Sequence, residues 1–274
     1  TGCAQAAESE KPAEDTKVEE EAAEDATEES SDVSGAVDTL NIAITKDENT
    51  LAPFTYVSGT GLTVNRLVYD TLMTTDSEDN IIPWMIEDDY EVVDFKEYTL
   101  TLKEGLKFHN GNPVTPEDIK FSYEYPATQN VSGQRKVCDK LESVEVVDED
   151  TVKFVLKEAD INYLRDGFCY IRIIDDAVYE GVEDATTVTE SVGSGMYKLV
   201  EYKTGEYYKL EAMDDYFRGT PTVKNINMPI MGDSTAIQQA LMSNELAAST
   251  GSIGIETQET MNYVPRFLAV AQIV

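Results

Sequence analysis

The sequence predicts a mixed α/β fold of the α+β kind, in which runs of strand alternate with isolated amphipathic helices. Short segments with an apolar residue at every second position recur along the 274-residue chain, and helical periodicity is confined to separate stretches between them. No segment repeats at a fixed period, which argues against a solenoid or a regular βαβ barrel. An apolar fraction of 41% is enough to fill a sizeable core.

The first predicted elements are a strand, a long loop and a helix. Leucine and isoleucine alternate with Asn41 and Ala43 across residues 40–44, which predicts a strand. A stretch rich in turn formers then runs to Gly61. Residues 62–73 follow as an amphipathic helix whose apolar face consists of Val64, Leu67, Val68 and Leu72.

The middle of the chain is rich in strands. Residues 98–102 alternate as in a half-buried strand, and residues 141–158 predict a hairpin that turns at Asp148–Asp150. Residues 195–214 predict a second hairpin, which turns at Thr204–Glu206.

One more amphipathic helix is predicted near the end of the chain, within residues 233–249. Its N-cap is Asp233 or Ser234, because these side chains accept hydrogen bonds from the free N–H groups of a first turn. Its apolar face consists of Ile237, Ala240 and Leu241.

Residues 105–124 contain a tight turn followed by a helix start. Asn110-Gly111 is a strong turn signal, because both residue types accept positive φ. The residues that begin the helix each have a capping role: Thr115 as N-cap, Pro116 at the first position and Asp118 in a capping box. The apolar residues that point from this helix into a core are Ile119 and Tyr123.

His109 is the single histidine of the chain, and we expect a structural role for it beside this turn. Its isolation excludes a zinc site built on paired histidines, and no G-x-S-x-G elbow accompanies it for a Ser-His-Asp triad. The glycine pairs at Gly59–Gly61 and Gly193–Gly195 lack the full G-x-G-x-x-G spacing of a nucleotide site. We therefore expect no enzymatic activity, no metal site and no cofactor.

The charge of the chain excludes another class of function. The chain has 21 basic and 53 acidic residues and a net charge of −32. Because phosphate contacts need clustered lysine and arginine, we expect no nucleic-acid binding. The sequence also contains no run of about 18 apolar residues that could cross a bilayer.

Residues 1–37 form a separate acidic leader. Its first 32 residues carry −10 of the net charge and almost no Leu, Ile or aromatic residue. Such a segment cannot bury enough apolar surface to offset the entropy of ordering, so we expect a disordered linker. The small residues before Cys3 in "TGCAQ", followed by this polar linker, resemble the lipobox of bacterial lipoproteins. By that resemblance Cys3 is the lipid-attachment site, and Thr1 and Gly2 remain from a signal peptide; an ordinary exposed cysteine is the alternative.

The other two cysteines, Cys138 and Cys169, allow two interpretations. In an oxidising compartment they could form one disulfide. Alternatively, Cys169 is a small buried apolar residue in a strand formed by "GFCYIRII", residues 167–174. The sequence leaves both interpretations open.

Residues 98–124, "YTLTLKEGLKFHNGNPVTPEDIKFSYE", closely resemble the signature of the family 5 extracellular solute-binding proteins, the peptide-binding lipoproteins of ABC importers. Residues 68–92 and 192–249 resemble further blocks of this family in the same order, so the resemblance covers about residues 39–249. Some positions depart from the family's pattern: Met196 replaces a proline, Asn244 replaces a glycine, Ala247-Ala248 stands where Asp-Ala is common, and Trp84 is shifted.

The resemblance implies a periplasmic-binding-protein-like fold of type II. By it, residues 38–66 and 186–260 form the core of the first lobe, residues 67–185 form an inserted β-rich subdomain, and residues 261–274 begin the crossover to a second lobe. The chain ends about where that lobe would begin, so we expect a first lobe whose second lobe is missing.

The family resemblance also implies a function. Family members close like a clam around an extracellular oligopeptide or a similar small polar solute and deliver it to a membrane permease. We therefore expect a non-enzymatic substrate-binding component of an ABC importer, monomeric and anchored by lipid on the cell surface or in the periplasm. Two loops are expected to face the cleft, with a stacking surface and a hydroxyl among them. The candidate substrate-binding residues are Phe54, Tyr56, Val57, Ser58, Gly193, Ser194, Gly195 and Tyr197, whereas His109 should lie away from the cleft.

Other functions remain open at this point. A nickel or haem binder of the same family would differ mainly in its cleft residues, and a single histidine makes direct nickel coordination by this lobe poor. A surface-anchored interaction lipoprotein would keep the anchor and the linker without taking part in transport. A non-functional gene fragment is the last alternative.

Overall fold

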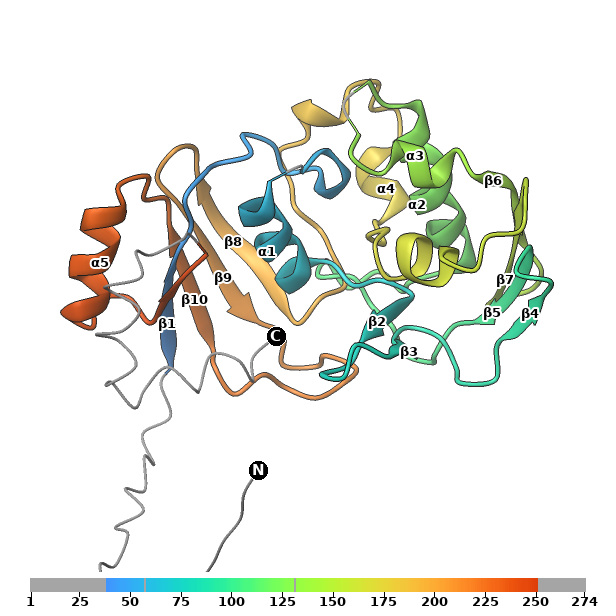
Figure 1. The fold of residues 1–274 in the computed structure, drawn as a ribbon, viewed down its shortest axis with the longest axis horizontal. Helices are drawn as coiled ribbons and strands as arrows, with labels where there is room; N and C mark the ends of the chain where they lie inside the picture. Colours follow the sequence, from blue (N-terminus) through green and yellow to red (C-terminus); the bar gives the residue numbers. More distant parts are fainter. Residues whose placement is uncertain (1–37, 57, 131, 251–274) are drawn as a thin grey trace, which may run out of the picture. The chain divides into compact units, whose positions relative to one another are not determined.

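The computed structural model describes residues 38–56, 58–130 and 132–250, and the structural statements below refer to that part of the chain. It contains a five-stranded sheet, a four-stranded sheet and a two-stranded hairpin, with helices packed against the two larger sheets (Figure 1). The acidic leader with Cys3, residue Val57 and the predicted crossover at 261–274 lie outside the described residues.

The five-stranded sheet combines strands from both ends of the described chain. Its order is β11 (Ala248–Ser249), β1 (Thr39–Ala43), β10 (Asn225–Pro229), β9 (Tyr207–Ala212) and β8 (Tyr197–Lys203). β1 runs parallel to β10 and to β11, whereas β8, β9 and β10 are antiparallel. The predicted first strand and the hairpin at residues 195–214 are confirmed, and Gly205 has a φ of +73° in the turn of that hairpin.

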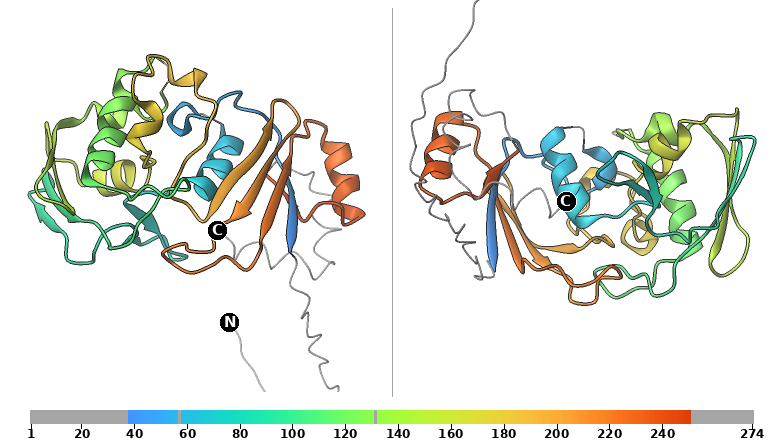
Figure 2. Two further views of the ribbon diagram at one scale, coloured as in Figure 1. Left: turned by 180° about the vertical axis from the view of Figure 1, so that it is seen from behind. Right: turned by 60° about the horizontal axis from the view of Figure 1, so that its bottom comes forward.

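Helices cover both faces of this sheet. The side chains of β1 point alternately to one face and the other, so neighbouring residues of this strand pack against different helices. Ala43 packs with the apolar residues of α5 (Ser234–Met242), whereas Ile42 packs on the face that α1 (Gly59–Val68) covers. Figures 1 and 2 show the two helices on opposite sides of the strands. Asp233 caps α5 as predicted, since its carboxylate accepts bonds from two backbone N–H groups of the first turn at 2.7 and 3.0 Å.

The bounds of α1 differ from the predicted helix at residues 62–73. The helix starts earlier because the hydroxyl of Ser58 accepts a hydrogen bond from a backbone N–H of the first turn at 3.0 Å. It ends earlier because the following residues are held extended by another segment: the Ile173 N–H donates to the Asp70 carbonyl at 3.0 Å. A tertiary contact therefore overrides the helical periodicity, and Leu72 lies beyond the helix.

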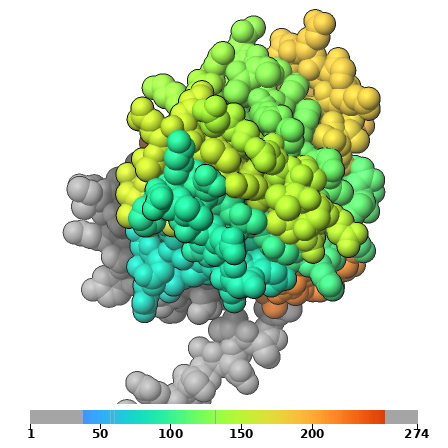
Figure 3. Space-filling view, turned by 90° about the vertical axis from the view of Figure 1, so that its right-hand side faces the viewer, coloured from blue at the N-terminus to red at the C-terminus, as the bar shows by residue number. Residues whose placement is uncertain are grey.

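The four-stranded sheet is antiparallel. Its order is β4 (Glu91–Val93), β5 (Glu97–Thr101), β7 (Thr151–Leu156) and β6 (Leu141–Val146), so the predicted strand at 98–102 and the hairpin at 141–158 are confirmed. Residues of β7 are alternately buried and half-buried, as expected for a strand with one face on a core. Figure 3 looks onto the side of the molecule formed by this part of the chain.

The helix α2 (Pro116–Thr128) packs on β6 and β7. Its predicted capping box is present: the Thr115 hydroxyl accepts from the Asp118 N–H, and the Asp118 carboxylate accepts from the Thr115 N–H at 2.9 Å. Ile119 and Tyr123 are buried as predicted, and the Tyr123 ring lies 4.8 Å from that of Phe154.

In the turn before α2, only one of the two expected positive φ angles occurs. Gly111 has a φ of +91°, whereas Asn110 does not lie in the left-handed region. The Asn110 side chain instead donates to Asp175 Oδ2 at 2.7 Å. A long-range hydrogen bond therefore determines the conformation of Asn110.

Short elements connect the two larger sheets. They are η1 (Pro53–Thr55), β2 (Met73–Thr75), β3 (Ile81–Pro83), α3 (Arg135–Cys138), the π-helical turn η2 (Leu164–Phe168), α4 (Asp176–Tyr179) and η3 (Ala185–Thr187). The strand predicted at residues 167–174 is wrong, because η2 and a loop occupy this stretch. The apolar residues of this stretch are buried in the two cores although they lie in a turn and a loop, because an apolar run shows burial but not the type of secondary structure. Cys138 and Cys169 are both free thiols.

The described residues form two main apolar cores. One core draws on residues 72–173 and contains the four-stranded sheet, and the other contains the five-stranded sheet. Ile174, Tyr179 and Ala185, which the sequence placed in the inserted subdomain, pack with the second of these cores. The predicted domain boundaries stay a prediction. Among the described residues, the helices are too short or too polar to cross a membrane.

Candidate functional site

The aromatic residues predicted to line the cleft are buried in the core of the first sheet. Phe54, Tyr56 and Tyr197 are 1%, 3% and 0% exposed. The Phe54 ring packs edge-on against Tyr125 with 5.8 Å between the ring centroids, and the Tyr197 hydroxyl donates to the Val223 carbonyl at 2.9 Å. These side chains do not present a stacking surface to solvent in this conformation. Their contact with a solute stays a prediction, and Val57 lies outside the described residues.

Ser58 has a structural role at the start of α1. Besides capping the helix, its hydroxyl and its backbone N–H contact the carboxylate of Glu48, the N–H at 3.2 Å from Oε1. Whether Ser58 also contacts a solute stays a prediction.

The predicted Gly193–Gly195 wall packs tightly against the end of α1. A Cβ atom at Gly193 would lie 1.9 Å from the Val68 carbonyl oxygen, and one at Gly195 would lie 2.6 Å from the Leu67 carbonyl oxygen. Only glycine permits this approach of two backbones. Between them, the Ser194 hydroxyl is buried without a hydrogen-bond partner.

His109 fastens this glycine segment to the turn before α2. Its Nε2 lies 2.8 Å from the Gly195 carbonyl oxygen, and its Nδ1 lies 3.3 Å from the Gly193 nitrogen. The neutral ring satisfies both contacts, with Nε2–H donating and Nδ1 accepting. Burial lowers the pKa of His109 to about 4, so the ring is neutral at pH 7. The expected structural role fits this geometry, yet His109 touches the segment that the sequence assigned to the cleft wall.

A hollow of about 900 Å³ lies between the C-terminal half of α1, the β2–β3 hairpin and the loop after η2. We call it the central hollow and define it by Arg66, Asp70, Trp84, Arg165, Tyr170 and Arg172. None of the seven candidate substrate-binding residues that the structure describes lines it. The sequence did not indicate this hollow, because the residues that define it come from three separate segments of the chain. The signal that could have found it is the concentration of arginine there in a chain of net charge −32.

Asp70 is a buried carboxylate in the wall of the central hollow, 6% exposed. Its Oδ1 accepts hydrogen bonds from the Trp84 indole N–H and the Tyr216 hydroxyl, both at 3.0 Å, while its Oδ2 has no partner. Burial raises the pKa of Asp70 to about 7 and outweighs these two hydrogen bonds, which favour the charged form. The guanidinium of Arg218 lies 4.0 Å from the centroid of the Trp84 ring and holds the indole from its other side.

Arg172 is the basic counterpart of Asp70 in this wall, 8% exposed. Its Nη1 donates to the Tyr69 carbonyl at 3.4 Å, and its Nε has no partner. Burial and, to a smaller extent, the positive charge of Arg66 lower the pKa of Arg172 to about 10, although the carboxylate of Asp70 acts in the opposite direction. The hollow thus holds one buried acceptor and one buried donor without protein partners, which is unusual for native interiors.

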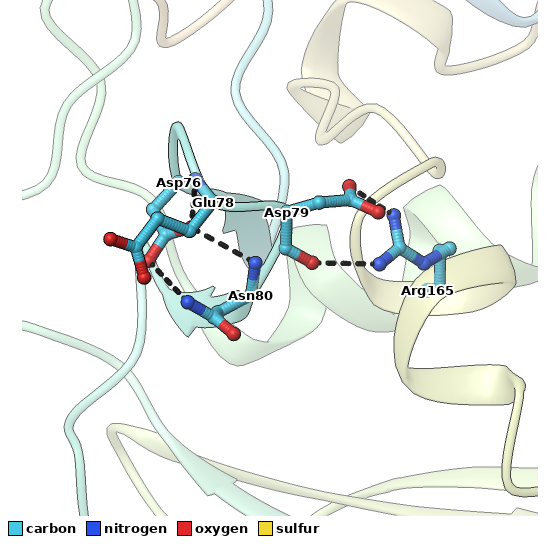
Figure 4. A network of polar contacts seen from close by, with 5 residues as sticks. All are labelled: Asp76, Glu78, Asp79, Asn80 and Arg165. Atoms are coloured by element: carbon cyan, nitrogen blue, oxygen red, sulfur yellow. Dashed lines mark hydrogen bonds and ion pairs between the residues drawn. The ribbon is translucent and has the colours of Figure 1, made fainter. Parts of the chain in front are cut away.

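A tight turn at Asp76–Asn80 forms part of the rim of the hollow (Figure 4). Asp76 Oδ1 accepts from the backbone N–H groups of Glu78 and Asn80, each at 2.9 Å. Arg165 of η2 binds Asp79 twice, through Nη1 to Oδ1 at 2.8 Å and through Nη2 to the carbonyl oxygen at 2.9 Å. These contacts fasten the hairpin side of the hollow to the η2 side.

A group of carboxylates at the starts of α2 and α4 has the spacing of a cation site. Oxygen atoms of Asp118, Asp175 and Asp176 lie within 4.8 Å of one another. Both Asp118 oxygens accept backbone N–H bonds, and both Asp175 oxygens accept bonds from N–H groups, among them the side-chain amides of Asn110 and Asn112. Capping and turn contacts account for this cluster, so it does not support a metal site.

Comparison with known proteins identifies the class of protein. Residues 80–269 match the family of bacterial extracellular solute-binding proteins, family 5 Middle. This match spans more than half of the chain, so the chain belongs to this family. The resemblance of residues 39–249 to family 5 is thereby confirmed.

Individual proteins of known name or structure are also similar to this chain. The chain is 29% identical over 190 residues to the oligopeptide-binding protein AppA of Bacillus subtilis, covering 67% of this chain and 35% of AppA. The solved structure of that protein in complex with a nonapeptide matches with a TM-score of 0.72 and 22% identity, over 84% of this chain and 47% of AppA. The structure of the ABC transporter substrate-binding protein CtaP of Listeria monocytogenes matches with a TM-score of 0.67 and 32% identity, over 77% of this chain and 44% of CtaP.

These matches confirm the predicted periplasmic-binding-protein-like fold of type II. The chain spans less than half of the length of the relatives it matches. Relatives with other printed names also occur: a nickel-binding periplasmic protein of Escherichia coli is 21% identical over 197 residues, covering 71% of this chain and 38% of that protein.

Proposed function

We propose that this chain belongs to the substrate-binding component of an ABC importer and contributes one wall of an oligopeptide site. The family is one of solute-binding proteins rather than enzymes. The oligopeptide-binding name of the Bacillus subtilis relative supports a peptide as the solute.

The observation that carries the proposal is the central hollow, where apolar and polar groups occur side by side. Asp70 Oδ2 and Arg172 Nε are buried without protein partners. A buried polar atom without a partner costs free energy, on the order of 1–3 kcal/mol, which a ligand that supplies the partner recovers. The apolar lining includes Leu62, Ile82, Trp84 and Met196. A short peptide offers both polar backbone groups and apolar side chains to such a surface.

A nickel- or haem-binding function has less support. The chain has a single histidine, and both ring nitrogens of His109 are engaged by the Gly193–Gly195 backbone. His109 therefore offers no nitrogen to a metal in this conformation. A surface-interaction lipoprotein outside transport is a further alternative that would leave the central hollow without a solute.

Lipid anchoring through Cys3, a monomeric state and delivery to a permease complete the proposal. Anchoring is tested by expressing the natural gene in a bacterial host that is fed a palmitate analogue with a clickable alkyne. We expect labelling of the natural protein and none of Cys3→Ala. Equal labelling of both would contradict the anchor and leave solute binding unaffected.

Peptide capture is tested by nuclear magnetic resonance with the ¹⁵N-labelled chain and trialanine. We expect weak binding, with a dissociation constant on the order of 1 mM, because a single wall encloses little of the ligand. The amide signals that shift should belong to residues around the central hollow. Shifts confined to other surfaces, or no shifts at all, would contradict a peptide site in the hollow.

A further inference from the structure

Arginine is concentrated at the central hollow. The described part of the chain has five arginines, and Arg66, Arg165 and Arg172 line the hollow. A fourth, Arg218, stacks on Trp84, which also lines it. Arg135 alone among these five lies elsewhere. Since acidic residues outnumber basic ones 53 to 21 in this chain, the concentration is not a consequence of overall composition.

Two of these arginines already have partners. Arg165 is bound twice by Asp79 on the rim, and Arg218 lies over the Trp84 ring. Arg66 and Arg172 differ from them. Within the described residues Arg66 has no hydrogen bond or ion pair, and Arg172 makes one long bond of 3.4 Å to a carbonyl while its Nε has none.

The carboxylates around the hollow do not neutralise this pair directly. Asp76 accepts three hydrogen bonds within its own turn, and Asp166 pairs with Lys140 at 3.7 Å. Asp70 directs Oδ1 to Trp84 and Tyr216, and no carboxylate oxygen of the described residues lies within 4.0 Å of the Arg172 guanidinium.

We propose that Arg66 and Arg172 form a carboxylate-binding position in the central hollow, which takes the C-terminal carboxylate of the bound solute. The inference rests on the proposed function and adds the chemical class of the group that the hollow selects. Arg66, exposed in the last turn of α1, supplies a charge that is free to move onto the ligand. Arg172 supplies the buried Nε–H donor, which is fixed in place by its bond to Tyr69. A guanidinium binds a carboxylate through charge-assisted hydrogen bonds, stronger than those between neutral groups.

The repulsion between the two arginines agrees with this assignment. Besides burial, which is the larger cause, the charge of Arg66 lowers the pKa of Arg172, whereas Asp70 raises it, so the two arginines repel each other and Asp70 offsets this only in part. A carboxylate between them removes this repulsion and supplies the partner that Arg172 Nε lacks. A neutral amide at the same place supplies an acceptor but no charge.

The test follows the Nε–H signals of the arginines in the ¹⁵N-labelled chain while three probes are titrated separately: trialanine, trialanine amide and N-acetylglycine. We expect trialanine and N-acetylglycine to shift the Arg172 Nε–H signal. Trialanine amide should bind about tenfold more weakly, because it lacks the charge-assisted bond. Arg66→Gln should weaken trialanine binding by a similar factor, whereas Arg135→Gln, an exposed arginine away from the hollow, should leave it unchanged.

Each outcome has a meaning. Equal binding of trialanine and its amide in the hollow would overturn the carboxylate position and leave peptide capture intact. Binding of N-acetylglycine at Arg172 without any binding of trialanine would support the position and contradict peptide capture. An unshifted Arg172 Nε–H with all three probes would overturn the inference. Thermal melting checks that Arg66→Gln is folded, which is expected because Arg66 is exposed and makes no hydrogen bond or ion pair within the described residues.

Discussion

The ring of His109 and the pair Asp70 and Arg172 differ in how their buried polar atoms are satisfied. Both ring nitrogens of His109 are bonded to the backbone of Gly193 and Gly195. In the central hollow, Asp70 and Arg172 each keep a buried polar atom without a partner. The first arrangement stabilises the fold, whereas the second leaves polar atoms unsatisfied at a cost in free energy, which a ligand would recover under the proposed function. His109, which belongs to the family signature, thus has structural contacts here, and the candidate site consists of residues outside that signature.

The largest effect is expected from a substitution that breaks the close contact between Gly193 and the end of α1. Gly193→Ala places a Cβ atom 1.9 Å from the Val68 carbonyl oxygen, so one of the two backbones must move. We expect a loss of at least about 4 kcal/mol in the free energy of unfolding, measured by urea denaturation. Gly59→Ala is the matched control, because a Cβ atom there meets nothing within 4 Å. A Gly193→Ala protein as stable as the control would show that this segment does not need glycine.

The raised pKa of Asp70 in the central hollow should make the free energy of unfolding depend on pH. The pKa of Asp70 is raised from 3.8 to about 7, so between pH 4 and 7 the folded state binds more protons than the unfolded state. Stability from this group is therefore complete below about pH 4 and is lost as the pH rises through 7, by about 3–4 kcal/mol. Asp70→Asn should remove this loss, measured as the difference between variant and wild-type unfolding free energies across the range. A difference that does not change with pH would contradict the raised pKa.

His109 should give the opposite slope. Its pKa is lowered from 6.5 to about 4, so between these values the unfolded state binds more protons. Stability from the neutral ring is present above pH 6.5 and is lost as the pH falls toward 4, by about 3 kcal/mol. His109→Gln should lose about 2 kcal/mol at pH 7 through its weaker bonds to the glycine backbone, and less than that at pH 4. A constant loss at both pH values would show that folding does not lower the pKa of His109.

The smallest expected effect concerns the rim of the hollow. Arg165 and Asp79 form an exposed pair, with side chains 46% and 76% exposed. Such pairs contribute little to stability, so Arg165→Gln should leave the free energy of unfolding nearly unchanged. Amide hydrogen exchange of the Asp76–Asn80 turn should rise in the variant, because the hairpin loses its link to η2. Unchanged exchange there would show that the turn holds itself in place.

Local patterns in the sequence predicted most of the fold. The strand β1, the two hairpins, the capping box at Thr115 and Asp118, and Asp233 as N-cap of α5 were all found from alternation and capping chemistry. These features are encoded within a few neighbouring residues, so an isolated sequence suffices to recognise them. The family membership could also be predicted, since residues 98–124 are a local signature.

The sequence was misleading where distant segments decide the structure. The end of α1, the side chain of Asn110 and the loop around Cys169 depend on contacts with residues far along the chain. The candidate site shows the same limit. Phe54, Tyr56 and Tyr197 were predicted to contact a solute, and the sequence could not show that they are buried in the described conformation; their contact with a solute stays a prediction.

By itself, the sequence determined the class of fold and the structural nature of the turn and helix around His109, because short-range periodicity and capping dictate these. It also indicated the family, because residues 98–124 resemble the signature of that family. Only the tertiary structure decided that Arg66, Asp70, Trp84 and Arg172 meet around one hollow. The reason is that burial, and the lack of a hydrogen-bond partner, are properties of the folded surroundings and not of a residue or its neighbours in sequence.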